Sequence, residues 1–409
     1  MKRNLKMLFL VFFLLIIYIY VFAISVLPDK VVVFEGESIN MRTIFGLNIN
    51  TNSDTIETAS NNSEKVAEKS GRATLEVSLF DKIFLKEVDV DILPKSTVVP
   101  VGSMAGVKLY TSGVLVVGMS EIEGIDNKKY RPYENTGIEE GDTIIQIDDK
   151  EILTTEELID TINGSKGSIL DIKYIHDEET KQCSMVPVET DENEYKIGLW
   201  VRDSAAGVGT VTFYEPETKS FGALGHGITD IDTEELINIS SGEFITTRIL
   251  NITKGESGNP GRIQGTVSEQ KNIGKISKNS KFGIYGKVDN ISNLGLDASK
   301  EMEVALREEI KTGKATILCT LDEQGPKEYE VEIEKIFTEN NYDNKSMKIK
   351  VIDERLIEKT GGIIQGMSGS PIIQNGKFIG AVTHVLVNNP LSGYAVFGDI
   401  MLKQLKEVE

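Results

Sequence analysis

The feature that most constrains the fold is a serine between glycines, followed at once by a turn signal. The run is Gly366-Met367-Ser368-Gly369-Ser370-Pro371, and Asn375-Gly376 comes shortly after it. Glycines allow a tight backbone turn, so the hydroxyl of Ser368 can stand clear of the main chain. The backbone N–H groups of Gly366 and Ser368 can then point toward one oxyanion. Asn-Gly is a strong signal for a two-residue β-hairpin, so the pattern predicts a reactive loop that enters a hairpin rather than a helix.

A nucleophilic serine needs a general base, because its hydroxyl does not ionise near neutral pH. The chain has only three histidines, His176, His226 and His384. Glycines flank His226 on both sides, which favours a histidine on a tight, partly exposed loop. We therefore predict Ser368 as nucleophile, His226 as base, and the backbone N–H groups of Gly366 and Ser368 as the oxyanion hole.

Two further roles remain, the substrate pocket and the group that orients the imidazole. His384 and Thr383 end a predicted strand after the hairpin, a place that lines the substrate pocket in chymotrypsin-like enzymes. We predict that both contact substrate. A carboxylate usually orients the catalytic histidine. Asp353 follows an alternating strand, whereas Asp230 and Asp232 lie near His226 in the sequence, and spacing does not decide between them.

The N-terminus predicts a membrane anchor. Met7–Leu27 is an uncharged run preceded by Lys2, Arg3 and Lys6. As a helix, it is long enough to span about 30 Å of hydrocarbon, and the flanking cations favour a cytoplasmic N-terminus. A cleaved signal peptide is the alternative, with a weaker cleavage signal at Ala23-Ile24-Ser25. Either reading places residues 30–409 outside the cytoplasm.

Length and charge limit the possible functions. With 409 residues, the chain is long enough for two or three domains. A net charge of −19 argues against nucleic acid as a partner, because phosphate binding requires clustered Lys and Arg. Cys183 and Cys319 are too few for a disulfide framework or a zinc site, and we expect buried thiols. Neither metal nor organic cofactor is predicted.

Alternating apolar residues predict a small β-rich unit over residues 31–97, after an anchor over residues 1–30. Leu75, Val77 and Leu79 form one alternating run and Val88, Val90 and Ile92 another. Within this unit, residues 48–70 are rich in Asn, Ser, Thr and Glu, so we predict a flexible linker that proteases could cleave.

Residues 98–190 look like a PDZ domain, an α+β module that binds a peptide as an added strand. The run Gly137-Ile138-Glu139-Glu140-Gly141-Asp142-Thr143-Ile144 matches bacterial PDZ modules, and Thr154-Thr155-Glu156-Glu157 is a capping box that opens a short helix. We predict that the peptide groove lies along Val114, Leu115 and Val116.

Residues 191–409 show many short β-like runs separated by Gly and Asn. Such spacing indicates a β-sandwich or barrel rather than βαβ units. About 210 residues are enough for two six-stranded barrels. The predicted fold class is therefore mainly β: a transmembrane helix, a small β-rich region, a PDZ-like domain and a chymotrypsin-like double β-barrel.

Taken together, the chain resembles the sporulation stage IV protein B peptidases, a serine peptidase family of endospore-forming bacteria. The anchor, the PDZ-like block and three long runs, 222–226, 360–377 and 379–385, carry the resemblance. It implies that His226, Ser368 and Asp353 form the catalytic triad. It also implies that the PDZ domain guides recognition and that the enzyme cleaves itself near its N-terminus.

The resemblance further implies a signalling protease. Such an enzyme enters the space between the two forespore membranes and cuts a membrane-bound regulatory subunit of an intramembrane metalloprotease complex. That cut leads to activation of a late sigma factor. The alternative reading is a tethered PDZ scaffold that binds partner peptides without catalysis.

Overall fold

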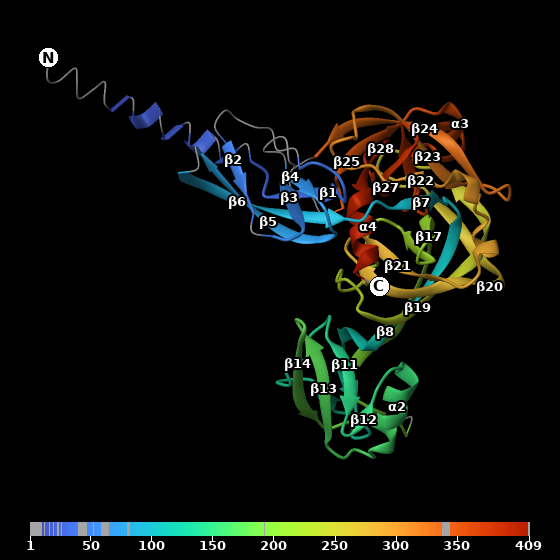
Figure 1. Cartoon of the computed structure of the whole chain (residues 1–409). Coiled ribbons are helices and arrows are strands. Elements are labelled where there is room, and N and C mark those ends of the chain that lie inside the picture. Colours follow the sequence, from blue (N-terminus) through green and yellow to red (C-terminus); the bar gives the residue numbers. More distant parts are fainter. Residues whose placement is uncertain are drawn as a thin grey trace.

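The computed structural model describes residues 10–407, apart from residues 12, 16, 19, 23, 26, 40–46, 52, 59–64, 80–81, 192 and 338–343. The described chain is mainly β. It forms an N-terminal sheet, two β-barrels in contact, and a smaller module that projects from the first barrel (Figure 1).

The N-terminal sheet has the strand order β1-β6-β5-β2, with β1 parallel to β6. Its strands are β1 (Lys30–Phe34), β2 (Leu47–Asn50), β5 (Gly71–Leu79) and β6 (Ile83–Leu93). The predicted alternation is confirmed, since Leu75, Val77, Val88 and Val90 are fully buried in one core.

The predicted flexible linker 48–70 is wrong for most of its described part. It contains strand β2 and the hairpin of β3 (Ile56–Thr58) and β4 (Lys65–Ala67). Backbone hydrogen bonds from Gly36 and Ile39 to β4 hold this hairpin on the sheet, at 2.7 Å each. Because these bonds use backbone atoms, a polar sequence is no obstacle to them. Residues 52 and 59–64 of the predicted linker lie outside the described residues.

The second barrel is closed by six antiparallel strands in the order β23-β24-β25-β28-β27-β26. Its elements are β23 (Gly313–Thr320), β24 (Pro326–Ile336), β25 (Met347–Val351), α3 (Glu354–Thr360), β26 (Pro371–Gln374), β27 (Lys377–Leu386), β28 (Asn389–Phe397) and the terminal helix α4 (Gly398–Lys406). Asn375 and Gly376 form the turn between β26 and β27, as predicted, and Asn375 has a positive φ of 52°. Apolar side chains fill the barrel, among them the unpaired thiol of Cys319, whereas unpaired Cys183 is half-buried in the projecting module.

The first barrel is a ring in the order β8-β19-β20-β21-β18-β17, closed by the pairing of β8 with β17. Its strands are β8 (Met104–Met119), β17 (Leu199–Glu215), β18 (Ser220–Ala223), β19 (Ile239–Thr253), β20 (Arg262–Ser280) and β21 (Gly283–Val288), flanked by β7 (Thr97–Pro100) and β22 (Met302–Glu303). Phe221 and Phe244 pack edge to face inside it, 4.8 Å between ring centroids. The predicted double β-barrel is therefore confirmed.

The projecting module is inserted into the first barrel. Both β8 and β17 are longer than the barrel requires, and their outer ends, 114–119 and 199–202, continue as a pair into the module. The module contains β9 (Ile122–Glu123), β10 (Lys129–Tyr130), β11 (Thr143–Ile147), β12 (Lys150–Glu151), α2 (Thr155–Gly164), β13 (Leu170–His176), β14 (Glu179–Met185), β15 (Val188–Glu189) and β16 (Tyr195–Lys196). The predicted boundaries at 98 and 191 are wrong, because residues 104–110 pair within the barrel.

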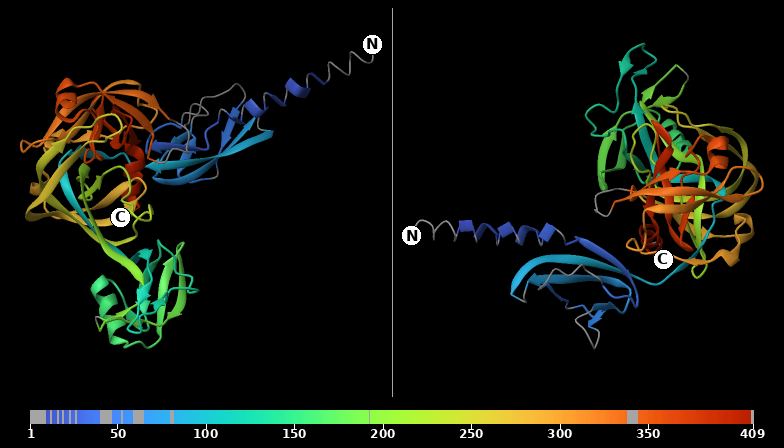
Figure 2. Two further views of the ribbon diagram at one scale, coloured as in Figure 1. Left: turned by 180° about the vertical axis from the view of Figure 1, so that it is seen from behind. Right: turned by 90° about the horizontal axis from the view of Figure 1, so that it is seen from above.

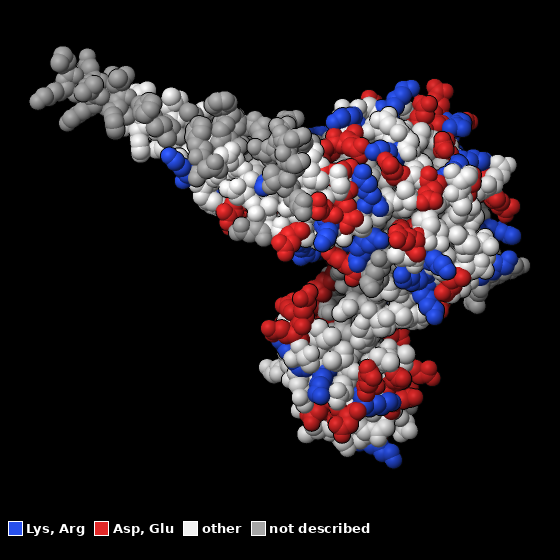
Figure 3. Space-filling view, viewed as in Figure 1, with Lys and Arg blue, Asp and Glu red and all other residues white. Residues whose placement is uncertain are grey.

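The N-terminal sheet and the inserted module lie on different sides of the barrels, as both further views show (Figure 2). Acidic and basic side chains are interspersed over the face of the barrels shown in Figure 3. Among the described residues, no helix is both long and apolar enough to cross a membrane. The predicted transmembrane segment Met7–Leu27 lies partly outside those residues.

Candidate active site

A cavity of about 390 Å³ lies between the two barrels and brings together most of the predicted site. Its lining includes His226, Gly366, Ser368, Thr383 and His384. The other lining residues are mainly apolar: Val107, Ala205, Ala206, Gly207, Val208, Leu224, Ile228, Ile363, Ile364, Gln365 and Val385. The first barrel thus supplies the histidine and the second supplies the serine.

His226 is held on a bent loop after β18. Leu224 and Gly225 both have left-handed backbone, with φ of 67° and 70°. A Cβ on Gly225 would lie 3.0 Å from Thr383 and 3.1 Å from Val396, so this loop lies against the second barrel. Glycine permits both the bend and the close approach.

The imidazole of His226 is oriented by a backbone carbonyl. Its Nδ1 lies 2.7 Å from the carbonyl oxygen of Gly227, which can only accept, so Nδ1 carries the proton. Nε2 is then left with a lone pair, the form that a general base requires. Burial lowers the pKa of His226, and the hydrogen bond to Gly227 opposes that effect in part.

Ser368 is half-buried on the loop between α3 and β26. Its hydroxyl donates to the carbonyl oxygen of Thr383 at 2.7 Å. A rotation about χ1 would release this hydrogen bond and turn Oγ within the cavity that His226 also lines. The neighbouring Met367 is fully buried in the second barrel, which fixes the position of the loop.

The predicted oxyanion donors are available. Among the residues that the structure describes, none accepts a hydrogen bond from the backbone N–H of Gly366 or Ser368. Both residues line the cavity. Such free N–H groups beside a nucleophile can stabilise the negative charge of a tetrahedral intermediate.

His384 lies against His226, with ring centroids 5.3 Å apart and planes inclined by 36°. Its Nδ1 is buried and has no hydrogen-bond partner among the described residues. Burial, together with His226 and Lys345, lowers the pKa of His384 to about 4. A neutral imidazole in the cavity wall agrees with the predicted contact with substrate.

The structure does not bring Asp353 to His226. Asp353 caps helix α3, accepting from the backbone N–H of Arg355 at 3.0 Å, and its carboxylate also binds the Arg355 guanidinium at 2.7 Å and the N–H of Glu330 at 3.2 Å. The hydrogen bonds from Arg355 lower the pKa of Asp353 to about 2. These partners occupy both oxygens of the carboxylate.

The two rival carboxylates are also engaged elsewhere. Asp230 and Asp232 both bind Arg202, which belongs to the outer part of β17. Asp230 is almost fully buried and also accepts the N–H groups of Asp232 and Thr233. The hairpin that follows His226 is therefore tied to the base of the inserted module.

The predicted peptide groove at Val114, Leu115 and Val116 is wrong. Leu115 pairs with Thr143 of β11 on one side and with Arg202 of β17 on the other, so this segment has no free edge. The glycine-flanked run identified a strand but not its position in the sheet.

A different edge is open. Within the described part of the chain, residues 199–203 of β17 have a strand partner only on the β8 side. Helix α2 lies along this segment, and the N–H of Thr155 at its start donates to Asp203 at 2.9 Å. An edge strand beside a helix is the arrangement that takes up an extended peptide. Sequence reasoning missed this edge because the sequence of residues 199–203 resembles that of any other half-buried strand.

Comparison with known proteins identifies the family. Residues 193–402 match the family model of the SpoIVB peptidase S55. The chain belongs to this family. It is therefore a serine peptidase of the SpoIVB S55 type with a mainly β fold.

Other comparisons are weaker. A search of curated proteins found no match. Among solved structures, the chain is similar to the PDZ domain of the SdrC-like protein from Listeria monocytogenes, with 23% identity over 22% of this chain and 87% of that one and a TM-score of 0.18. It is also similar to the HtrA-type protease AlgW with decapeptide, with 9% identity over 76% of this chain and 65% of that one and a TM-score of 0.30.

Proposed function

We propose that this S55 peptidase is a membrane-anchored, extracytoplasmic serine endopeptidase that acts in sporulation signalling. The observation that carries the catalytic part is the shared cavity of His226 and Ser368, with the free N–H groups of Gly366 and Ser368 beside them. These groups are the ones that acyl transfer requires: a serine hydroxyl, a neutral imidazole and two oxyanion donors.

In the proposed reaction, Ser368 attacks the carbonyl carbon of a peptide bond while Nε2 of His226 takes the hydroxyl proton. The N–H groups of Gly366 and Ser368 stabilise the oxyanion. His226 then gives the proton to the leaving amine, and water hydrolyses the acyl-enzyme by the same steps. The carbonyl of Gly227 supports the orientation of His226. The orienting role that the resemblance gives to Asp353 stays a prediction.

The biological role is proposed from the family resemblance. The substrates would be the N-terminal region of the enzyme itself and a membrane-bound regulatory subunit of an intramembrane metalloprotease complex, leading to activation of a late sigma factor. The exposed apolar side chains near the N-terminus support the proposed anchor, including Leu10, Phe13, Leu14 and Phe22. Such a surface is more stable in lipid than in water.

The test uses a fluorophosphonate probe and the purified full-length chain. We expect covalent labelling at Ser368, loss of labelling in His226→Ala, and no self-processing by Ser368→Ala. Ser370→Ala is the matched control, because Ser370 is two residues away, fully buried, and has an Oγ without a partner among the described residues. Self-processing by pure Ser368→Ala would contradict the proposal. No labelling of folded wild-type protein would favour a non-catalytic peptide-binding scaffold.

A further inference from the structure

We propose that Thr210 is a positioning residue that sets the oxyanion hole from the opposite barrel. This inference rests on the proposed role of Ser368 as nucleophile. Thr210 belongs to β17 of the first barrel and is 2% exposed. It contacts the serine loop of the second barrel twice: its hydroxyl donates to the carbonyl of Gly366 at 2.8 Å, and its N–H donates to the carbonyl of Ser368 at 3.1 Å.

These two contacts fix the peptide groups that precede and follow the one between Met367 and Ser368. The peptide group between Gly366 and Met367 is held at its carbonyl by Thr210 and at its N–H by Ile364, at 3.1 Å. The group between Ser368 and Gly369 is held at its carbonyl by Thr210 and at its N–H by Val382, at 2.7 Å. A peptide group is planar, so a bond at each end fixes its rotation.

The middle peptide group carries the oxyanion donor. Its carbonyl, on Met367, accepts from the N–H of Ser370 at 3.0 Å. Its N–H belongs to Ser368, which lines the cavity, and has no acceptor among the described residues. The second donor, the N–H of Gly366, is held in a similar way. It shares a peptide group with the carbonyl of Gln365, which accepts from the N–H of Ile263 at 2.8 Å. Among the residues that the structure describes, Thr210 supplies the one side-chain hydrogen bond to these peptide groups.

The loop needs such a clamp because its glycines allow other conformations. Gly366 has a φ of 99° and Gly369 a φ of 95°, a region that glycine occupies without the strain other residues meet there. A Cβ on Gly369 would lie 2.2 Å from the carbonyl oxygen of Thr210, so the two barrels meet backbone to backbone here. Without the Thr210 hydroxyl, the group between Gly366 and Met367 would keep only one of its two hydrogen bonds.

The chain offers a matched control on the same strand. Thr212 is also fully buried, two residues further along β17, and its Oγ1 has no partner among the described residues. Thr210→Val and Thr212→Val make the same isosteric change and keep both backbone N–H groups. Thr210→Ser keeps the hydroxyl and serves as the conservative variant.

The measurement separates positioning from general stability. Full-length variants are assayed on a fluorogenic peptide that spans the cut site mapped by N-terminal sequencing of processed wild-type protein. The aldehyde of the same peptide is tested as inhibitor, because its hemiacetal oxygen occupies the oxyanion hole. Thermal unfolding reports the fold of each variant.

We expect Thr210→Val to lower kcat about 10- to 100-fold, below the full loss of an oxyanion donor, with KM within about twofold. The inhibition constant of the aldehyde should rise by the same factor as kcat/KM falls. Thr212→Val should match wild type, and Thr210→Ser should recover kcat to within a few-fold.

Two results would overturn the inference: a folded Thr210→Val with the kcat of Thr212→Val, or a reduced kcat with unchanged aldehyde affinity. If Thr210→Val does not fold, Thr210→Ala is compared with Thr212→Ala under the same criteria. Absence of fluorophosphonate labelling at Ser368 in wild type would instead refute the proposed nucleophile, so the two failures are distinguishable.

Discussion

At the scale of single residues, the cavity contains two imidazoles that differ in their hydrogen bonding. His226 has a hydrogen bond at Nδ1, whereas Nδ1 of His384 has none among the described residues. Burial is the main cause of the lowered pKa of both groups. Both histidines are therefore neutral at pH 7, and their ionisation belongs to the acidic range.

The lowered pKa of His226 predicts the acid limit of activity. Because the base must be neutral, kcat/KM should fall as the pH drops through the pKa of His226, with a midpoint below the ordinary histidine value of about 6.5. The pH profile of kcat/KM on the mapped peptide measures it. His176→Gln, a change in the inserted module, should leave the midpoint unchanged. A midpoint at or above pH 6.5 would disagree with a buried base.

The contacts of Asp353 predict that replacing it lowers the stability of the fold. Asp353→Ala removes a helix cap and leaves the backbone N–H of Glu330 and the Arg355 guanidinium without this acceptor. We expect a loss of about 1–3 kcal/mol in the free energy of unfolding, measured with urea. Turnover of the folded variant then tests the catalytic role that the resemblance implies. A variant as stable as wild type would contradict the structural role of Asp353.

At the scale of elements, β17 connects three functional positions. Its outer end offers the open edge at residues 199–203, Arg202 binds the hairpin after His226, and Thr210 clamps the serine loop. One continuous strand thus runs from this open edge to the serine loop. A change at one end of a paired strand has a direct covalent and hydrogen-bonded route to the other.

Arg202→Gln should loosen the hairpin at residues 228–237. It leaves the buried carboxylate of Asp230 without its cation, and since Arg202 is partly exposed we expect about 2 kcal/mol, below the 3–5 kcal/mol typical of fully buried pairs. Hydrogen exchange of the hairpin amides should become faster. Asp232→Asn is the control, because that carboxylate is 46% exposed and its pair contributes under about 1 kcal/mol. Unchanged exchange in Arg202→Gln would show that Arg202 does not hold the hairpin.

Sequence patterns predicted those parts of the fold and of the site that depend on residues close together in the sequence. The glycine-flanked serine, the Asn375-Gly376 turn and the period-two strands are local features, and the structure confirms the loop, the hairpin and the barrels. The nesting of the module was not predictable, because the pairing of β8 with β17 joins segments distant in sequence. Thr210 follows a run of small residues with no periodic signal, and its role depends on that same long-range pairing.

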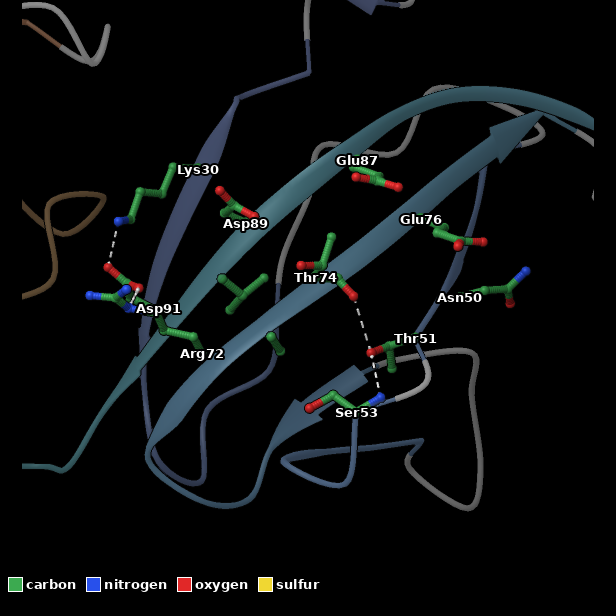
Figure 4. Close-up of a pocket in the computed structure, with 12 residues that line it drawn as sticks. Lys30, Asn50, Thr51, Ser53, Arg72, Thr74, Glu76, Glu87, Asp89 and Asp91 are labelled. Atoms are coloured by element: carbon green, nitrogen blue, oxygen red, sulfur yellow. Dashed lines mark hydrogen bonds and ion pairs between the residues drawn. The ribbon is translucent and has the colours of Figure 1, made fainter.

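At the scale of the whole molecule, the N-terminal sheet is fastened to the second barrel by apolar contacts and by one buried carboxylate. Val32, Phe34 and Leu93 pack in a cluster with helix α4. Asp91 of β6 is 4% exposed and binds Lys30, at 2.7 Å, and Lys403 of α4. Figure 4 shows Asp91 between Lys30 and Arg72 at the edge of the polar face of the sheet.

Asp91→Asn should weaken this attachment. It leaves Lys30 and Lys403 close together without a counter-charge, at a cost of about 3 kcal/mol. Trypsin should then cut more rapidly at Lys95, in the segment between sheet and barrel. Asp89→Asn, two residues earlier on the exposed face of the same strand, should behave as wild type. Equal cleavage rates for the two variants would show that Asp91 is not needed for the attachment.

The insertion of the module into a barrel strand pair has a consequence for processing. Two chain crossings, β8 outward and β17 inward, join the module to the barrel. A single nick in either crossing would leave the module covalently tethered through the other. One cut between the sheet and the barrel would therefore sever the only covalent link of the N-terminal sheet, whereas two cuts would be needed to sever both links of the module.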